Sequence, residues 1–264
     1  MERALLTSLP AAVLGLLCVL VAMGVAAGGL LLVRRRVALS TRSGLNDVAG
    51  VLIAIVGGLY GVLLAFVVAI AWQSFEDASG LADREAVVVV AMYRDAGFFS
   101  THQADIRASV ERYARSVIDQ EWDAMSTEAG DSPATDAALA NVISEVKSIS
   151  PQTLQEGTLY NQLITRLDSL EEARQDRLFA AGSQLPGPLW LALIVGGLIT
   201  VGFTYCFGLP SERAHLAMVA AVAATIGLTL FLIMSLDLPF TGDVAVAPNS
   251  MREAIAEFSH LATP

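Results

Sequence analysis

The pattern of hydrophobic and polar residues divides the chain into four long apolar segments and one long polar block. The apolar segments cover residues 11–33, 48–72, 189–207 and 215–236, and none has Asp, Glu, Lys or Arg in its interior. A helix that crosses the hydrocarbon core of a bilayer needs about 20 apolar residues, each adding about 1.5 Å. We therefore predict four transmembrane helices, with a polar block over 73–188 between the second and the third.

The polar block has the periodicity of helices. Ile106, Val110, Tyr113 and Val117 recur close to every 3.6 residues, and charged residues occupy the other faces. Ser-Pro pairs at 132–133 and at 150–151 are typical of helix starts, and the second pair is expected to begin a long helix. Since Gly and Pro do not interrupt the chain directly after Trp72, the second span is expected to continue past Asp83. The fold class is therefore all-α.

The tail is expected to form a short amphipathic helix over 250–261. Ser250 and Glu253 have the spacing of a capping box, and Met251, Ile255 and Phe258 share one face. We expect this helix to lie either on the membrane surface or on the helical block. The predicted organisation is spans over 1–72, a helical domain over 73–188, spans over 189–236 and an outward tail over 237–264.

Arginines in the short loops predict the orientation. Arg34, Arg35 and Arg36 follow the first span directly, and Arg42 adds to them, so the basic loop 34–47 is expected in the cytoplasm. The helical domain and both termini then face outward, in a multi-pass protein of the cell membrane. Trp72 and Trp190 fall at the outer ends of their spans, where interfacial Trp is favoured.

Composition changes this picture mainly through charge. Hydrophobic residues make up 55% of the chain and charged residues 16%, and the net charge is −10. The block 73–188 contains nine Lys and Arg against nineteen Asp and Glu. This excess of acids argues against a nucleic-acid partner, because too few cations are available to neutralise phosphates. Around an entrance shared by several copies, it would concentrate cations and repel anions.

Candidate catalytic chemistry is scarce. The three His are far apart in sequence, and the acidic cluster Asp119, Glu121 and Asp123 is interpreted as a solvated helix face. Gly57-Gly58 and Gly196-Gly197 fall inside spans, where glycine usually allows close helix approach. We predict no catalytic residue, no cofactor and no metal site, and therefore no enzyme.

Two rows of residues on the second span are more informative. Small residues repeat every four positions at Gly57, Gly61, Ala65 and Ala69, and we interpret them as a helix-packing seam, either within the subunit or between subunits. Large apolar residues occupy another face, at Leu59, Leu63, Phe66 and Ile70. This row faces lipid, or it lines a pore as a hydrophobic constriction that closes by dewetting.

A turn and an ion pair are expected at the end of the fourth span. Pro239 cannot continue the helix after Asp237, Phe240 follows, and Gly242 permits a backbone geometry that other residues resist. A carboxylate at a helix C-terminus is unfavourable, so Asp237 should have a cationic partner. The candidates are Arg174 and Arg177, which come one turn apart before the third span; a solvated acid in an ordinary turn is the alternative.

Several of these segments together resemble a known family. The sequence from Gly58 to Trp72 followed by Phe75 and Glu85-Ala86 is similar to the opening signature of the bestrophin-like family of bacterial and plant membrane proteins. Matching motifs follow in the family's order: Tyr93-Arg94, Glu121-Trp122 with Met125, Arg174 with Arg177-Leu178, Leu185-Pro186 with Trp190, and the segment from Asp237 to Gly242. The resemblance implies distant similarity to bestrophins, which are oligomeric, all-α anion channels.

Two functions remain open at this point. The first is a homo-oligomeric, bestrophin-like membrane protein that conducts inorganic ions, with an outer vestibule that favours cations. The second is a non-conducting scaffold or sensor, anchored by its spans and acting through the outward helical domain. The partners expected in both cases are the lipid bilayer and further copies of the chain.

Overall fold

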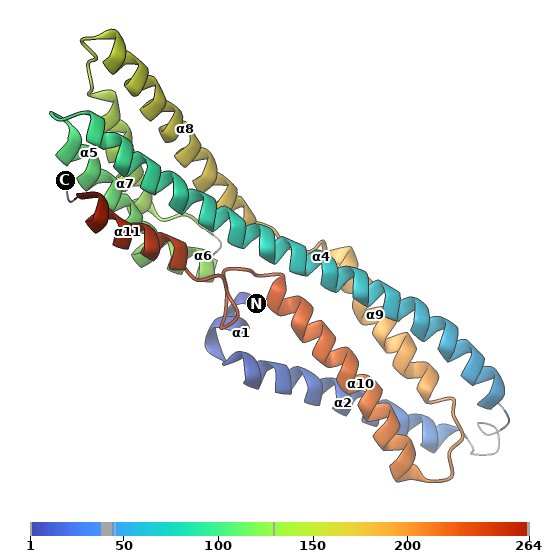
Figure 1. Ribbon diagram of the computed structural model, residues 1–264. Coiled ribbons are helices and arrows are strands. Elements are labelled where there is room, and N and C mark those ends of the chain that lie inside the picture. The colour runs from blue at the N-terminus through green and yellow to red at the C-terminus, as the bar shows by residue number, and fades with distance from the viewer. Residues whose placement is uncertain (1, 38–43, 45, 129, 263–264) are drawn as a thin grey trace. The chain divides into compact units, whose positions relative to one another are not determined.

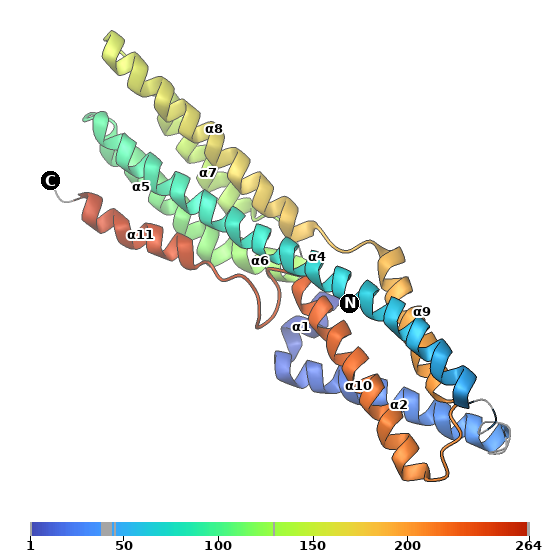
Figure 2. The same ribbon diagram turned by 45° about the vertical axis from the view of Figure 1, so that its right-hand side comes forward.

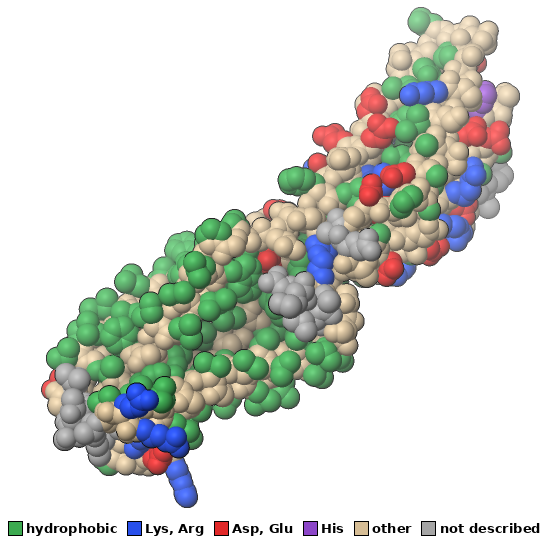
Figure 3. Space-filling view, turned by 180° about the vertical axis from the view of Figure 1, so that it is seen from behind, with side chains coloured by type: hydrophobic (Ala, Val, Ile, Leu, Met, Phe, Trp, Pro, Cys, Tyr) green, Lys and Arg blue, Asp and Glu red, His purple; other side chains and the backbone are tan. Residues whose placement is uncertain are grey.

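In the computed structural model, residues 2–37, 44, 46–128 and 130–262 are described, and every regular element in these ranges is a helix (Figure 1). The chain divides into two compact units. We call Met1–Gln73 with Gln184–Asp237 the membrane unit, and Ser74–Ser183 with Leu238–Pro264 the helical unit. The all-α prediction is confirmed, and Figure 3 shows hydrophobic side chains dominating one region of the surface and charged side chains another.

The membrane unit contains the four predicted spans. Its elements are α1 (Glu2–Ser8), α2 (Ala11–Arg36), the first part of α4 (Asn46–Asp95), α9 (Gly187–Thr204) and α10 (Glu212–Leu236). Four candidate spans are long and apolar enough to cross a membrane, and they contain α2, α4, α9 and α10 respectively. Much of the predicted basic loop 34–47 lies outside the described residues, at 38–43 and 45.

Within this unit, α2 packs along α10, and α4 packs against α9. Ala26 and Leu30 of α2 form a buried cluster with Val219 and Ala223 of α10. On α4 the packed side chain is Tyr60, whose hydroxyl donates a hydrogen bond of 2.8 Å to the carbonyl of Leu193. The Tyr60 ring lies directly on the backbone of α9, because a Cβ added at Gly196 would lie 2.6 Å from its Cδ2 atom.

The helical unit is built around the second part of α4. It adds η1 (Ala96–Phe98), α5 (Gln103–Ser116), a π-helical turn η2 (Val117–Glu121), α6 (Trp122–Glu128), α7 (Pro133–Lys147), α8 (Leu154–Gly182) and α11 (Asn249–Ala262). Figures 1 and 2 show α5, α7 and α11 grouped along the second part of α4. The core is contributed by apolar residues from α4, α5, α7, α8 and α11, including Val89, Val110, Val142, Leu163 and Met251.

Several local predictions hold and two do not. Helix α4 continues through Gly80 to Asp95, and α7 begins at Pro133 after Ser132, as expected. The expected helix start at Ser150-Pro151 is wrong, because α8 begins at Leu154 with Thr153 as its cap. The Thr153 hydroxyl accepts from the amide of Glu156, and the Glu156 carboxylate accepts from the amide of Gln152. These two side-chain caps fix the start of α8 after the proline.

The tail helix α11 lies on the helical unit, which was one of the two expected positions. Met251, Ala254 and Phe258 are buried in its core, and the Phe258 ring stacks on Tyr93 with 4.0 Å between centroids. The expected capping box is wrong: α11 begins at Asn249, and the Ser250 hydroxyl donates to the Asp83 carboxylate of α4 instead.

We predict that Gly196→Ala destabilises the membrane unit and that Gly202→Ala does not. The added methyl group at position 196 would overlap the Tyr60 ring, whereas no atom of the described chain beyond its own helix lies within 4 Å of a Cβ at Gly202. Overpacking of this kind costs about 1–3 kcal/mol, and alanine in an open helical position gains about 0.5–1 kcal/mol over glycine. Thermal unfolding in mild detergent measures both, and equal effects would contradict the close approach.

Candidate functional site

A buried network of charges lies in the core of the helical unit. Glu85, Glu121 and Arg177 are fully buried, and Arg174 is 7% exposed. Glu85 comes from α4, Glu121 from the π-helical turn η2, and both arginines from α8. The network therefore ties three elements together that are far apart in the sequence.

Each arginine binds carboxylates through more than one nitrogen. Arg177 donates from Nη2 to Glu121 Oε2 at 2.6 Å and to Glu85 Oε1 at 3.2 Å, and its Nε also donates to Glu85. Arg174 donates from Nε to Glu121 Oε1 at 3.1 Å and from Nη2 to Asp136 Oδ1 of α7 at 2.7 Å. Such forked, charge-assisted bonds are stronger and more directional than neutral ones.

Aromatic and sulfur groups surround the Arg177 guanidinium. It lies over the Trp122 ring, with 5.2 Å to the centroid, and Nη1 lies 3.0 Å from Met125 Sδ. Tyr113 donates its hydroxyl proton to Glu85 Oε1 at 2.6 Å. The two fully buried carboxylates are thus matched by two arginines and one phenol.

Burial and charge shift the pKa values in this network. Burial alone would lower the pKa of Arg177, but its contacts with Glu85 and Glu121 outweigh burial, so the pKa is raised. Burial, and then the neighbouring Glu85 carboxylate, raise the pKa of Tyr113 well above its ordinary value. Arg177 and Tyr113 therefore both keep the protons that they donate to the carboxylates.

The network has a structural role. Its charges face one another rather than an opening, and removing one partner of a buried ion pair costs about 3–5 kcal/mol because the other charge is left uncompensated. We therefore assign it the role of holding α4, η2 and α8 in one arrangement. This arrangement fixes the second part of α4.

The surroundings of these acids differ from those predicted. Glu121, which is predicted on a solvated helix face, is fully buried, and so is Glu85, for which the sequence predicts no role beyond its place in the family signature. A signal was present: Arg174 and Arg177 continue the apolar stripe of Leu163, Leu167 and Leu170 on α8, so their positions face the core. Buried arginines require buried acids, although the stripe alone does not say which acids.

The expected ion pair of Asp237 with Arg174 or Arg177 stays a prediction. Among the described contacts, Arg174 binds Glu121 and Asp136, and Arg177 binds Glu85 and Glu121. In the membrane unit, Asp237 is 7% exposed, and its Oδ1 accepts the amide of Leu185 at 2.7 Å. Its charge also acts on Arg3: burial lowers the pKa of Arg3, and Asp237 opposes that shift. Arg3 of α1 is thus a cation close to Asp237 within the same unit.

The turn predicted after Asp237 is present. Leu238 accepts the amide of Thr241 at 3.0 Å, and the Pro239 carbonyl accepts the amide of Val246 at 2.7 Å. Gly242 has a φ of 88°, a left-handed value that glycine adopts without strain. Phe240 is buried in the helical unit and contacts the Trp122 ring edge-on, at 5.6 Å between centroids.

The two rows predicted on α4 are both largely uncovered within the subunit. Leu59, Phe66 and Ile70 are 69%, 65% and 50% exposed, and Leu63 is half-buried. In the small-residue row, Gly61, Ala65 and Ala69 are exposed, and only Gly57 is partly covered. The face of α4 that packs inside the subunit is instead formed by Tyr60, Val67 and Ala71. The small residues beyond Gly57 therefore do not form an intrasubunit seam.

Above about pH 10, we predict a loss of stability that depends on Tyr113. The pKa of this phenol is raised in the folded state, whereas in the unfolded chain it is about 10. Its contribution is therefore complete below pH 10 and is lost as the pH rises further, by up to about 1.4 kcal/mol per pH unit. The difference in unfolding free energy between the protein and Tyr113→Phe should shrink between pH 10 and 11.5. A difference that stays constant over this range would contradict the assignment.

Comparison with known proteins identifies the family of this chain and solved structures with a similar fold. The family described as Bestrophin-like domain matches residues 12–251. Among solved structures, a variant of a bacterial bestrophin homologue from Klebsiella pneumoniae has a TM-score of 0.69 at 13% identity, covering 93% of this chain and 99% of that one. Another structure of a Klebsiella pneumoniae bestrophin homologue has a TM-score of 0.65 at 15% identity, covering 90% and 96%. No curated protein matches.

The matched family segment begins at the start of α2 and ends within α11, so it contains all four candidate spans and most of the helical unit. The solved structures share this fold over nine-tenths of the chain. The chain is therefore an all-helical membrane protein that belongs to the bestrophin-like family.

Proposed function

We propose that the protein is a homo-oligomeric channel of the cell membrane in which α4 lines the path of an inorganic ion. The exposed row Leu59, Phe66 and Ile70 is the observation that carries this proposal. Several copies arranged around an axis would bring these side chains together as stacked apolar rings. A constriction of this kind excludes water when narrow and conducts when it widens.

The small-residue row supports the same arrangement. Gly61, Ala65 and Ala69 lie beside the apolar row on α4 and have no role in packing the subunit. Small residues let neighbouring helices approach closely in a bilayer, where helices gain no hydrophobic energy from leaving lipid. In the proposed oligomer, this row contacts the next copy while the apolar row faces the axis.

Charge suggests which ions enter. The block 73–188 has ten more acids than bases. Repeated around an entrance, this excess raises the local concentration of cations and lowers that of anions. We therefore propose a vestibule that favours cations, in contrast to the anion channels that the family name suggests.

A second function is supported by the surface of α8. Leu154 and Phe179 are 92% and 80% exposed on this helix, although both are large and apolar. They lie at opposite ends of α8, about 37 Å apart along the helix, so a partner that runs along α8 would cover both. A non-conducting scaffold or sensor would use this surface and need no continuous path along α4.

Planar-bilayer recording of the purified protein distinguishes the two functions. With mixed K⁺, Na⁺ and Cl⁻ gradients, we expect a current whose reversal potential follows the cations. Leu59→Ser should increase the conductance, because a hydroxyl hydrates the apolar ring. Leu228→Ser is the matched control, since Leu228 is a 56% exposed leucine on α10, and it should leave the conductance unchanged.

Absence of current from the protein and from Leu59→Ser would favour the scaffold. A current that follows Cl⁻ would retain the channel and refute the cation preference. Equal effects of the two serine substitutions would remove Leu59 from the path.

For the orientation, we propose that the helical domain and both termini lie outside the cell, on the evidence of Arg34, Arg35 and Arg36 at the end of α2. With Cys18 and Cys206 replaced by alanine, Asp131→Cys should react with an impermeant thiol reagent on intact cells. Glu212→Cys, before the fourth span, should react only after lysis. The reverse pattern would place the domain in the cytoplasm.

A further inference from the structure

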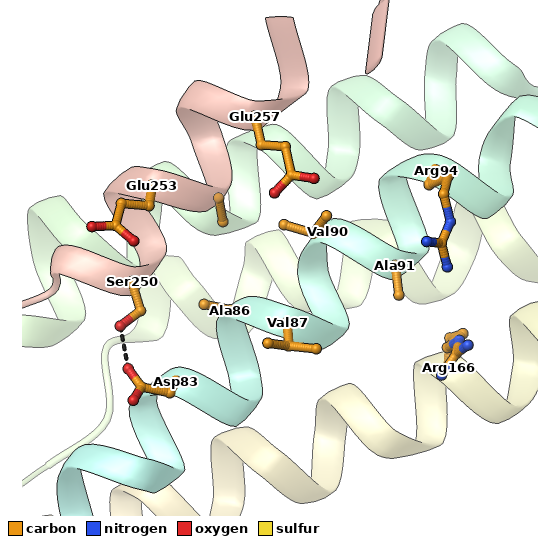
Figure 4. A pocket seen from close by; sticks show the side chains of 11 residues that line it. Asp83, Ala86, Val87, Val90, Ala91, Arg94, Arg166, Ser250, Glu253 and Glu257 are labelled. Atoms are coloured by element: carbon orange, nitrogen blue, oxygen red, sulfur yellow. Dashed lines mark hydrogen bonds between the residues drawn. The ribbon is translucent and has the colours of Figure 1, made fainter. Parts of the chain in front are cut away.

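An open groove of about 620 Å³ lies on the helical unit between α4, α8 and α11 (Figure 4). Its floor consists of small and apolar residues of α4: Ala86, Val87, Val90 and Ala91. Val87 is 68% exposed, so a large apolar side chain on the groove floor is left uncovered. The hydrogen bond from Ser250 to Asp83 holds α11 against α4 and fixes one wall.

The two ends of the groove carry opposite charge. Asp83 of α4 and Glu253 and Glu257 of α11 line one part, and Figure 4 shows them along the side where α11 runs. The two glutamates are four residues apart on one helix, a spacing at which like charges repel. This part of the groove therefore favours an occupant with positive charge.

Arg94 of α4 and Arg166 of α8 line the other end. Both guanidinium groups share one carboxylate, that of Asp95, at 3.5 and 3.4 Å. One positive charge is therefore in excess at this end. An occupant that fits the groove is rod-shaped. It has two cations toward one end, one anion toward the other, and a small side chain between them.

We propose that the occupant is α5 of a second copy of this chain. The exposed face of α5 presents Asp105, Ala108, Arg112 and Arg115, at spacings of three or four residues that align them on one side of the helix. The anion comes first, a small residue follows, and the two cations come last. Arg115 shares its charge with Glu111 of its own helix, at 2.6 Å, whereas Arg112 donates only to a backbone carbonyl among its described contacts.

The lengths agree as well as the charges. From Asp83 to Arg94, α4 rises about 16 Å, and from Asp105 to Arg115, α5 rises about 15 Å. With α5 of the second copy antiparallel to α4, Asp105 meets Arg94 and Arg166, and Arg115 meets Asp83. Ala108 then faces the partly exposed Val90 on the groove floor, and the small alanine side chain permits close helix packing at the crossing.

The contact is head-to-tail, because the groove of one copy receives a different surface of the next. Contacts of this kind close into a ring when the rotation between copies allows it. Asp105, Ala108, Arg112 and Arg115 are exposed and do not line the groove of their own copy, so this face of α5 can enter the groove of another copy. This inference rests on the proposed homo-oligomer and names one contact by which it forms.

Cysteine cross-linking of the full-length protein tests this contact. In a background with Cys18→Ala and Cys206→Ala, Val90→Cys, at a partly exposed position of the groove, and Ala108→Cys are made singly and together. Mild oxidation should give a disulfide-linked pair when the two single variants are co-expressed, and a ladder of higher species from the double variant. Val90→Cys with Thr165→Cys, an exposed position on α8, is the matched control and should not cross-link.

Charge exchange supplies a second measurement. Arg112→Glu should lower the yield of the cross-linked pair by about tenfold, because like charges would then face each other across the contact. Adding Glu257→Arg on the other copy should restore it. Both substitutions are at exposed positions, so they leave the fold of each copy intact.

The outcomes separate this inference from the proposed function. If light scattering in mild detergent shows a monomer for the unsubstituted protein, the homo-oligomer itself is refuted. If the protein is oligomeric but the position-90 and position-108 variants give no more cross-link than the control, the contact is overturned while the oligomer stands. Cross-linking of either single variant with itself would also overturn it, since a symmetric contact would then occupy the site.

Discussion

The buried pairing of Arg177 with Glu85 and Glu121 is the interaction on which the helical unit depends. It joins α4, the turn η2 and α8 at a point where all three side chains are fully removed from water. Taking such charges out of water is expensive, and only the forked hydrogen bonds, the Tyr113 phenol and the second arginine offset that cost. Because an ion pair in this setting tolerates little displacement, it restrains movement of the three helices against one another.

The exposed surfaces follow from that arrangement. With α8 and η2 on one side of α4, and α11 held at Asp83, a strip of α4 is left open as the groove. In the membrane unit, Tyr60 fixes the face of α4 that packs against α9, and the row of Leu59, Phe66 and Ile70 is left uncovered. The groove and the apolar row of α4 are therefore both surfaces that the packing within each unit leaves available.

Much of the fold could be predicted from the sequence, because its signals are local. The four spans depend on length and hydropathy, and the continuity of α4 depends on the lack of Gly or Pro breaks after Trp72. The site was harder to predict, because its pairs join residues 28 to 92 positions apart. The apolar stripe of α8 contains the signal that Arg174 and Arg177 face the core, but periodicity does not say which acids they bind. The start of α8 was missed because Thr153 and Glu156 cap it more effectively than Ser150-Pro151 does.

The position of α11 has a consequence for how the protein is made. Met251, Ala254 and Phe258 complete a core whose other members begin at Ala86. The ribosome synthesises these three residues after the fourth span, at about 5–20 residues per second, so the helical unit cannot close its core while the chain is being inserted. Until then, the apolar surface that Phe258 covers, including the Tyr93 ring, is open to water. Insertion of the spans must therefore come before the final folding of the helical unit, and a chain shortened before α11 would leave that unit unfinished.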